Sequence, residues 1–260
     1  MNRRSVTSLL DHRKGNRNMV QEKNDLPSLA EAIRLLAGIG TATLTSQLYK
    51  RGIHHAFLKG VYPMNPNRTR FVGEAYTLRF IPMREDKMKP EVVKGYDYPH
   101  RKCIESCPPG QVLVVDARGV TDSGIFGEIL LTRLMKRGAA AVVCDGAMRD
   151  AEAISKMDLP VFAAGPAAPL NLTAHFAVDL QQPIACGCVA VFPGDILVGD
   201  PDGVVVLPRY PAPEIARDAV KQEHLEQFLH RLVLEGASTV GTYPPNAETL
   251  DAYARWCEKG

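Results

Sequence analysis

The sequence predicts a single α/β domain with extra helices at both ends. Between residues 111 and 163, short apolar runs alternate with a helical pattern, which is typical of a βαβ unit. These runs are continuously apolar, as strands buried on both faces usually are. After residue 180, further apolar runs are separated by Pro-Gly-Asp and Asp-Pro-Asp-Gly turns, which indicates a β-rich second half.

The chain opens with a basic segment, residues 1–24, which carries six Lys and Arg against two acids. We interpret this segment as a mobile arm or a subunit-contact segment. Ser28 is placed to cap a helix over Leu29–Leu36, where apolar residues recur at helical spacing. Two glycines interrupt the pattern, and we expect a second helix over Thr41–Tyr49.

Residues 71–83, FVGEAYTLRFIPM, mix β-branched and aromatic residues and predict a strand. The following stretch, residues 84–109, is polar and rich in Lys and Pro, so we interpret it as a long excursion from the domain. Several side chains in this region suit either a solvated surface, which we favour, or the recognition of a second substrate carboxylate: Arg79, Arg84, Lys87, His100 and Arg101.

The βαβ unit has three apolar strands, over Gln111–Val115, Ala139–Cys144 and Val161–Ala163. The helix between the first two strands carries Phe126, Leu130 and Leu134 four residues apart, and Gly138 ends it. Later strands are expected over Val189–Phe192, Ile196–Val198 and Val204–Leu207, followed by one long helix over Ala212–Leu234. We therefore divide the chain into an arm (1–24), a domain (25–236) and a C-terminal tail (237–260).

Composition excludes several classes of protein. The net charge is only +2, whereas a nucleic-acid-binding surface usually makes a chain much more basic. No apolar run approaches the roughly 18 residues of a membrane-spanning helix, and the first residues lack the apolar core of a secretory signal. We expect a soluble, cytoplasmic protein that contacts neither membrane nor nucleic acid directly.

The six cysteines form no paired CxxC units, which argues against structural zinc and favours six reduced thiols. Cys144, Cys186 and Cys188 lie in apolar, strand-like text and are expected to be buried. Several catalytic patterns are also missing from the sequence: a P-loop, a G-x-S-x-G elbow, His residues at metal-binding spacing and a Lys within an apolar strand.

The strongest candidate site combines two segments. Arg149-Asp150 follows a buried strand and an Asp-Gly turn, so both side chains emerge at the carboxyl edge of the sheet, where open α/β sheets bind ligands. Gly124-Ile-Phe-Gly127 precedes a helix whose N-terminus lies at the same edge and offers N–H groups to an anion. Arg suits a carboxylate, and Asp suits a hard divalent cation. The alternatives are a surface ion pair or helix cap for Arg149-Asp150, and an ordinary turn for the glycines.

These residues resemble a known signature. Glu128, then twenty residues, then Arg149-Asp150 is similar to the pattern of the class II pyruvate aldolases that act on 4-hydroxy-4-methyl-2-oxoglutarate. The flanking text FGEILLTRLMKRGAAAVVCDGAMRD and PGDILVGDPDGVVVLPR resembles the same superfamily, which also contains the regulators of ribonuclease E activity. The resemblance covers roughly residues 35–225 and is densest over 111–207. It implies a β/β/α layered, swivelling-domain-like fold for the domain 25–236.

The resemblance also implies roles for individual residues. Gly127, Glu128, Ile129 and Leu130 occupy the loop that binds the 2-oxo acid through backbone N–H groups. Arg149 matches the arginine that binds substrate and stabilises the developing oxyanion. Asp150 matches the aspartate that holds Mg²⁺, Mn²⁺ or another divalent cation. Glu128 occupies the acidic position, where it acts in catalysis through a water. The regulators tend to lack this acid, so Glu128 favours an enzyme.

We therefore expect a metal-dependent lyase that cleaves a 4-hydroxy-2-oxo acid to pyruvate and a carbonyl compound, and that also decarboxylates oxaloacetate. The resemblance implies a homotrimer or a hexamer. Two alternatives remain: a non-catalytic regulator that binds a ribonuclease, and a metal-dependent dehydratase of a 2-keto-3-deoxy sugar acid.

Overall fold

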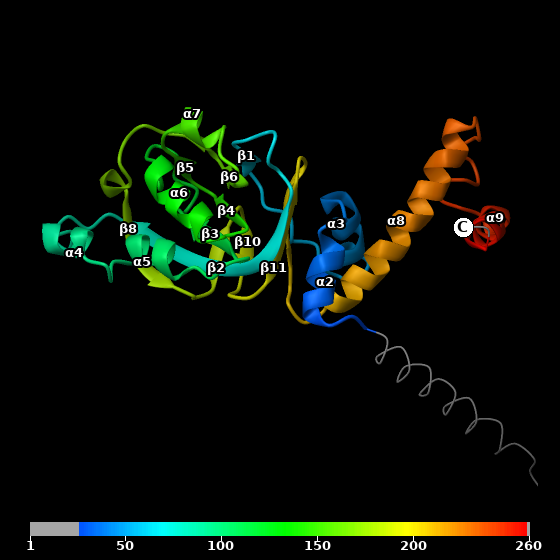
Figure 1. Cartoon of the computed structure of the whole chain (residues 1–260), viewed down its shortest axis with the longest axis horizontal. Helices are drawn as coiled ribbons and strands as arrows, with labels where there is room; N and C mark the ends of the chain where they lie inside the picture. Colours follow the sequence, from blue (N-terminus) through cyan, green and yellow to red (C-terminus); the bar gives the residue numbers. More distant parts are fainter. Residues whose placement is uncertain (1–25, 259–260) are drawn as a thin grey trace, which may run out of the picture.

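The computed structural model describes residues 26–258, so the predicted arm, residues 1–24, lies outside the described residues. An eight-stranded mixed sheet organises the fold, in the order β1-β6-β4-β3-β2-β11-β12, with β8 also paired to β2 (Figure 1). Its strands are β1 (Tyr62–Pro63), β2 (Phe71–Pro82), β3 (Val112–Asp116), β4 (Ala141–Cys144), β6 (Val161–Ala163), β8 (His175–Leu180), β11 (Ile196–Asp200) and β12 (Gly203–Leu207). Two short pairs lie outside this sheet, β5 (Ala147–Met148) with β7 (Gly165–Pro166), and β9 (Ile184–Cys186) with β10 (Val189–Val191).

The helices of the described residues are α2 (Leu29–Leu36), α3 (Thr41–Tyr49), α4 (Pro90–Lys94), α5 (Pro99–Ser106), α6 (Glu128–Lys136), α7 (Ala151–Ile154), α8 (Ala212–Leu234) and α9 (Ala247–Cys257), with a 3-10 turn at Asn171–Thr173. None of them combines the length and the apolar character that crossing a bilayer requires.

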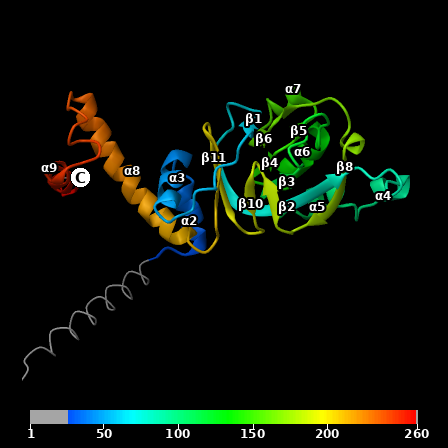
Figure 2. The same ribbon diagram turned by 180° about the vertical axis from the view of Figure 1, so that it is seen from behind.

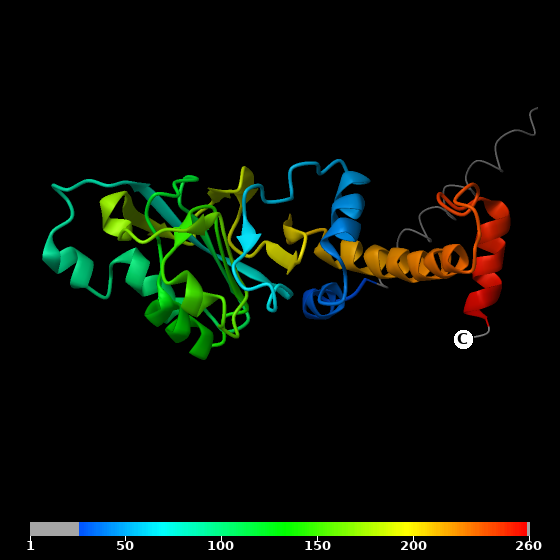
Figure 3. The same cartoon turned by 90° about the horizontal axis from the view of Figure 1, so that it is seen from above.

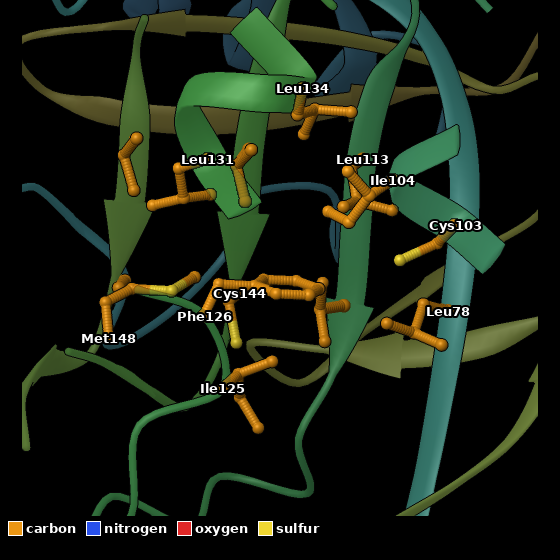
Figure 4. Close-up of a cluster of buried hydrophobic side chains, with 14 of the residues drawn as sticks. Leu78, Cys103, Ile104, Leu113, Ile125, Phe126, Leu131, Leu134, Cys144 and Met148 are labelled. Carbon is orange, nitrogen blue, oxygen red and sulfur yellow. The ribbon is translucent and has the colours of Figure 1, made fainter. Parts of the chain in front are cut away.

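Each face of the sheet is covered by a different layer. Leu113 and Val115 of β3 join one hydrophobic cluster with Leu131 of α6 (Figure 4). Val112 and Val114 point the other way and join a second cluster with the β9–β10 hairpin. Because both faces are buried, β3 reads as a continuous apolar run, and it pairs in parallel with β4 as the βαβ pattern predicts. The expected β/β/α layering is confirmed.

Helices α2 and α3 and the first part of α8 pack together against β11 and β12 (Figure 2). Ser28 caps α2 as the sequence indicates, and Glu31 completes a capping box with it. The N-terminus of α3 is held differently, because Asp200 accepts hydrogen bonds from the N–H and the hydroxyl of Thr41, both at 2.8 Å. Helix α8 then projects away from the sheet, and α9 crosses its far end (Figure 3). The segment 237–260, interpreted as a tail, thus contains a helix whose Trp256 ring lies 5.4 Å from that of Phe228.

The interpretation of residues 84–109 as a polar excursion is wrong in its second half. This half forms α5, which packs into the main core and buries His100, Cys103 and Ile104. These residues share one face of the helix, but the cations between them dominate the local composition. His100 therefore belongs neither to a solvated surface nor to a carboxylate-binding site.

The cysteine predictions hold with one exception. All six cysteines are free, and Cys144 and Cys186 are buried. Cys188 is exposed, because Gly187 and Cys188 form the two-residue turn between β9 and β10 with φ values of 51° and 65°. Turns with two positive φ angles match the twist of a hairpin. Cys188 therefore belongs to the turn and not to a buried strand, and its thiol is exposed.

Burial of His100 makes stability depend on pH. The ring stacks on Phe126, and its Nε2 lies 2.8 Å from the carbonyl oxygen of Ile125. Burial lowers the pKa of His100 to about 4, so below pH ~6.5 the unfolded chain binds more protons than the folded one. We expect this residue to remove about 2 kcal/mol from the free energy of unfolding between about pH 7 and pH 5.

Urea unfolding at these two pH values checks this prediction. His100→Phe, although less stable overall, should lose about 2 kcal/mol less than the wild type over the same pH interval. His55→Phe, which replaces an exposed histidine, should leave the pH dependence unchanged. An unchanged pH dependence in His100→Phe would show that this ring is not the source.

Candidate active site at the carboxyl edge of the sheet

The structure brings the two segments of the predicted site into direct contact. The N–H of Glu128, the first residue of α6, donates to Oδ2 of Asp150 at 3.0 Å. The N–H of Arg149 donates to the carbonyl oxygen of Phe126 at 2.8 Å. Figure 1 shows β5, α6 and α7 grouped at the same end of the molecule. The predicted juxtaposition of the two segments is therefore present, through one backbone–backbone and one backbone–side-chain hydrogen bond that the sequence could not specify.

Two glycines permit this close approach. A Cβ at Gly124 would lie 2.4 Å from Cγ of Arg149 and 2.8 Å from the carbonyl oxygen of Ala167. A Cβ at Gly127 would lie 2.4 Å from Oδ2 of Asp150. The Gly-Ile-Phe-Gly segment is thus more than an ordinary turn, because its two glycines leave room for the Arg-Asp pair.

Arg149 is a half-buried cation held at its backbone and free at its side chain. Its Nε is buried and has no hydrogen-bond partner, and no carboxylate of residues 26–258 forms an ion pair with it. A buried polar group without a partner is unusual in a folded protein and indicates a ligand, a water or a catalytic role. This arrangement excludes the alternative in which Arg149 belongs to a surface ion pair.

Asp150 is exposed and adopts a left-handed conformation, with φ 56° and ψ 44°. This region is uncommon for residues other than glycine, and such outliers concentrate at functional sites. The side chain does not cap its own helix, α7, but caps α6 by accepting the N–H of Glu128, so the helix-cap alternative is present for Asp150. Only its Oδ2 is used in this way, and Oδ1 accepts no hydrogen bond from the described residues.

The first turn of α6 leaves backbone donors open. Gly127 is the N-cap and supplies no side-chain cap. The N–H groups of Ile129 and Leu130 belong to the first turn, where an α-helix has no internal acceptors for them. These groups and the helix dipole favour a bound anion. The Ile129 side chain is 84% exposed, whereas Leu130 packs against the main core.

A depression of about 230 Å³ lies beside Asp150. It is lined by Met148, Asp150, Ala151, Pro166, Ala167 and Ala168. The last three belong to the segment after β6, which the sequence did not associate with the site. The one sequence feature that marks this segment is the run Pro-Ala-Ala-Pro-Leu at residues 166–170, and such a run is also typical of an ordinary loop.

The carboxylates present suit a hard divalent cation that keeps most of its waters. Asp150 has a free oxygen, and the exposed Glu128 carboxylate has no hydrogen-bonding partner among the described residues. Within residues 26–258, no group of three or more His, Cys, Asp or Glu could enclose a metal ion. Mg²⁺ is commonly held by one or two carboxylates, with waters and substrate completing its shell, so these residues fit it.

Comparisons with known proteins identify the family of the chain. The family model described as RraA-like: Aldolase/RraA matches residues 41–206. A 4-hydroxy-4-methyl-2-oxoglutarate aldolase of Thermus thermophilus is 30% identical over 167 residues, which cover 64% of this chain and 92% of that protein.

Solved structures share the fold. Streptomyces coelicolor RraAS2, an unusual member of the RNase ES inhibitor RraA protein family, superimposes with a TM-score of 0.69 at 31% identity, over 78% of this chain and 97% of that one. An uncharacterized protein from Pseudomonas syringae has a TM-score of 0.71 at 24% identity, over 82% and 97% of the two chains, and supports the fold alone. The family model matches more than half of the length of this chain, and the chain therefore belongs to the RraA-like family.

Proposed function

We propose that this protein is a divalent-metal-dependent lyase that cleaves a 4-hydroxy-2-oxo acid into pyruvate and a carbonyl compound. The observation that carries the proposal is the unpaired, half-buried Arg149 beside Asp150 and the open first turn of α6. A 2-oxo acid presents a carboxylate and a ketone oxygen on adjacent carbons. These two oxygens can be bound by an arginine, by the N–H groups of a helix N-terminus and by a metal ion that a carboxylate holds.

Each residue of the site has a separate role in binding or catalysis. The N–H groups of Ile129 and Leu130 bind the substrate carboxylate and orient the substrate. The N–H of Glu128, which the resemblance also assigns to this task, is instead donated to Asp150. Asp150, with Glu128, would hold Mg²⁺ or Mn²⁺, which supplies Lewis-acid polarisation of the 2-oxo group when bound. Arg149 stabilises the negative charge that develops on the C2 oxygen as the C3–C4 bond breaks.

Proton transfer falls to Glu128. A water held by this carboxylate takes the proton from the C4 hydroxyl, so that C4 becomes a carbonyl and the electron pair of the C3–C4 bond moves toward C2. A proton then returns to C3 and pyruvate leaves. Loss of carbon dioxide from oxaloacetate places the same charge on the same oxygen, so we propose oxaloacetate decarboxylation as a second activity of this site.

A non-catalytic regulator of a ribonuclease is the second candidate, because the similarity to RraAS2 is as high as that to the aldolase. Glu128 and the free Arg149 favour the enzyme, since surface binding of a protein requires neither. We further propose a cytoplasmic homotrimer or hexamer, as the family resemblance implies.

Pyruvate release tests the proposal. With Mg²⁺, the full-length protein should release pyruvate from a 4-hydroxy-2-oxo acid and from oxaloacetate. EDTA should reduce the rate at least about 100-fold, and added Mg²⁺ should restore it. Mass spectrometry should find the cleaved carbonyl product and not a dehydrated acid. No pyruvate from any of these compounds with any divalent cation would exclude the lyase and leave the regulator as the better hypothesis.

A further inference from the structure

The apolar run at residues 166–170 forms one wall of the candidate site, and its first three residues, Pro166, Ala167 and Ala168, line the depression beside Asp150. Residues 166–170 read Pro-Ala-Ala-Pro-Leu, and no polar side chain interrupts them. Leu170 is 50% exposed, and Pro166, Ala168 and Pro169 are exposed as well. A continuous run of exposed apolar residues beside polar groups is typical of a binding surface.

Backbone hydrogen bonds hold this wall, residues 166–170, against both halves of the site. Strand β7 pairs in parallel with β5, the strand that leads directly into Arg149. On one side, the N–H of Ala167 donates to the carbonyl oxygen of Met148 at 2.8 Å. On the other side, the N–H of Gly124 donates to the carbonyl oxygen of Pro169 at 3.0 Å. The wall is therefore a fixed part of the site and not a separate surface loop.

The wall offers no cation for a second carboxylate. Asp150 is the only charged side chain among the described residues that line the depression, and its charge is negative. Two of the cations that the sequence suggested for this purpose are engaged elsewhere, because Arg79 pairs with Asp179 and Arg84 pairs with Asp86. Arg149 is already assigned to the 2-oxo acid end of the substrate.

From this juxtaposition we propose that the wall, residues 166–170, binds an uncharged alkyl substituent on C4 of the substrate. The inference rests on the proposed function and names its substrate class: a 4-hydroxy-2-oxo acid with a single carboxylate. The second product is then a neutral aldehyde or ketone. A second carboxylate on C4 would lie against apolar side chains that offer it no cationic partner, which is unfavourable for an ion.

Two substrates that differ in this substituent test the proposal. 4-Hydroxy-2-oxopentanoate carries a methyl group on C4, whereas 4-hydroxy-4-methyl-2-oxoglutarate carries a methyl group and a carboxylate. For the full-length protein with Mg²⁺, we expect kcat/KM to be at least about tenfold higher for the monocarboxylate. Each cleavage of the dicarboxylate yields two pyruvates, so the rates are compared per C3–C4 bond broken.

A substitution in the wall should reverse this preference. Ala168→Arg adds a cation at an exposed position and should raise the dicarboxylate-to-monocarboxylate ratio of kcat/KM about tenfold. Ala168→Gln is the matched control, since it adds a long polar side chain without charge and should not produce this rise. Sedimentation velocity of each variant should match that of the wild type.

The outcomes separate the two proposals. Release from the dicarboxylate at an equal or higher kcat/KM than from the monocarboxylate would overturn the apolar wall and leave the lyase intact. Release from neither compound would overturn the lyase, and the wall with it. An altered assembly state in Ala168→Arg with an unchanged ratio would identify residues 166–170 as a contact between copies of the chain, which also overturns the inference.

Discussion

Replacing Arg149 with lysine is expected to lower kcat for pyruvate release about 10²- to 10³-fold. Lysine keeps the positive charge but lacks the planar fork of donors that matches adjacent carboxylate and ketone oxygens. The cost is high because no Lys or Arg is among the described residues that line the depression beside Asp150, and because the buried Nε of Arg149 has no hydrogen-bond partner in the protein. The measurement is steady-state pyruvate release with saturating Mg²⁺.

The effect should appear in catalysis and not in folding. The backbone of Arg149 is held by the N–H contact to Phe126, which the substitution preserves, so the midpoint of thermal unfolding should change little. Arg133→Lys is a matched control, because this arginine lies near the other end of α6 in an exposed pair with Glu105. Such pairs contribute little, and the control should keep wild-type activity. An Arg149→Lys enzyme within tenfold of the wild type would refute the assigned role.

The βαβ core and the meeting of the two site segments could be predicted from the sequence, because both depend on short-range patterns. The apolar runs of β3 and β4 indicate burial on both faces, and parallel strands place their carboxyl ends at one edge. Because both segments follow strands that end at this edge, the proximity of Gly127 and Arg149 can be predicted from the strand pattern alone. The left-handed backbone of Asp150 and its contact with the N–H of Glu128 could not be predicted, since no short-range pattern in the sequence indicates either.

Three features could not be predicted from the sequence, namely the burial of His100, the apolar wall and helix α9. Each depends on contacts between residues that are distant in sequence. His100 lies in a segment of cations, and only its packing on Phe126 shows that it is buried. The apolar wall was missed for a similar reason, because residues 166–170 reach the site through hydrogen bonds to Gly124 and Met148. Helix α9 is held by aromatic rings of α8, and it buries no residue of its own that would give a strong apolar stripe.

Replacing Asp150 with asparagine is expected to reduce kcat/KM at fixed Mg²⁺ at least about 100-fold, since even residues behind a metal ligand cost 10- to 100-fold. Asparagine tolerates the left-handed conformation, and its amide oxygen can still accept the N–H of Glu128. The substitution therefore removes the charge while preserving the local backbone. Activation curves against Mg²⁺ and Mn²⁺ should shift to higher metal concentration.

A control variant distinguishes the specific effect of the Asp150 charge from the effect of removing any one negative charge from the protein. Asp158→Asn removes one carboxylate from an exposed pair with Arg68. Among the described residues, neither member of this pair forms an ion pair with Asp150 or Glu128, so the substitution should leave the activation curves unchanged. Mn²⁺ binding followed by electron paramagnetic resonance should weaken in Asp150→Asn and not in Asp158→Asn. If Asp150→Asn lost activity while Mn²⁺ bound as in the wild type, the carboxylate would act on the substrate and not on the metal. Since Oδ2 already accepts a backbone N–H, Oδ1 is the atom on which the metal assignment depends.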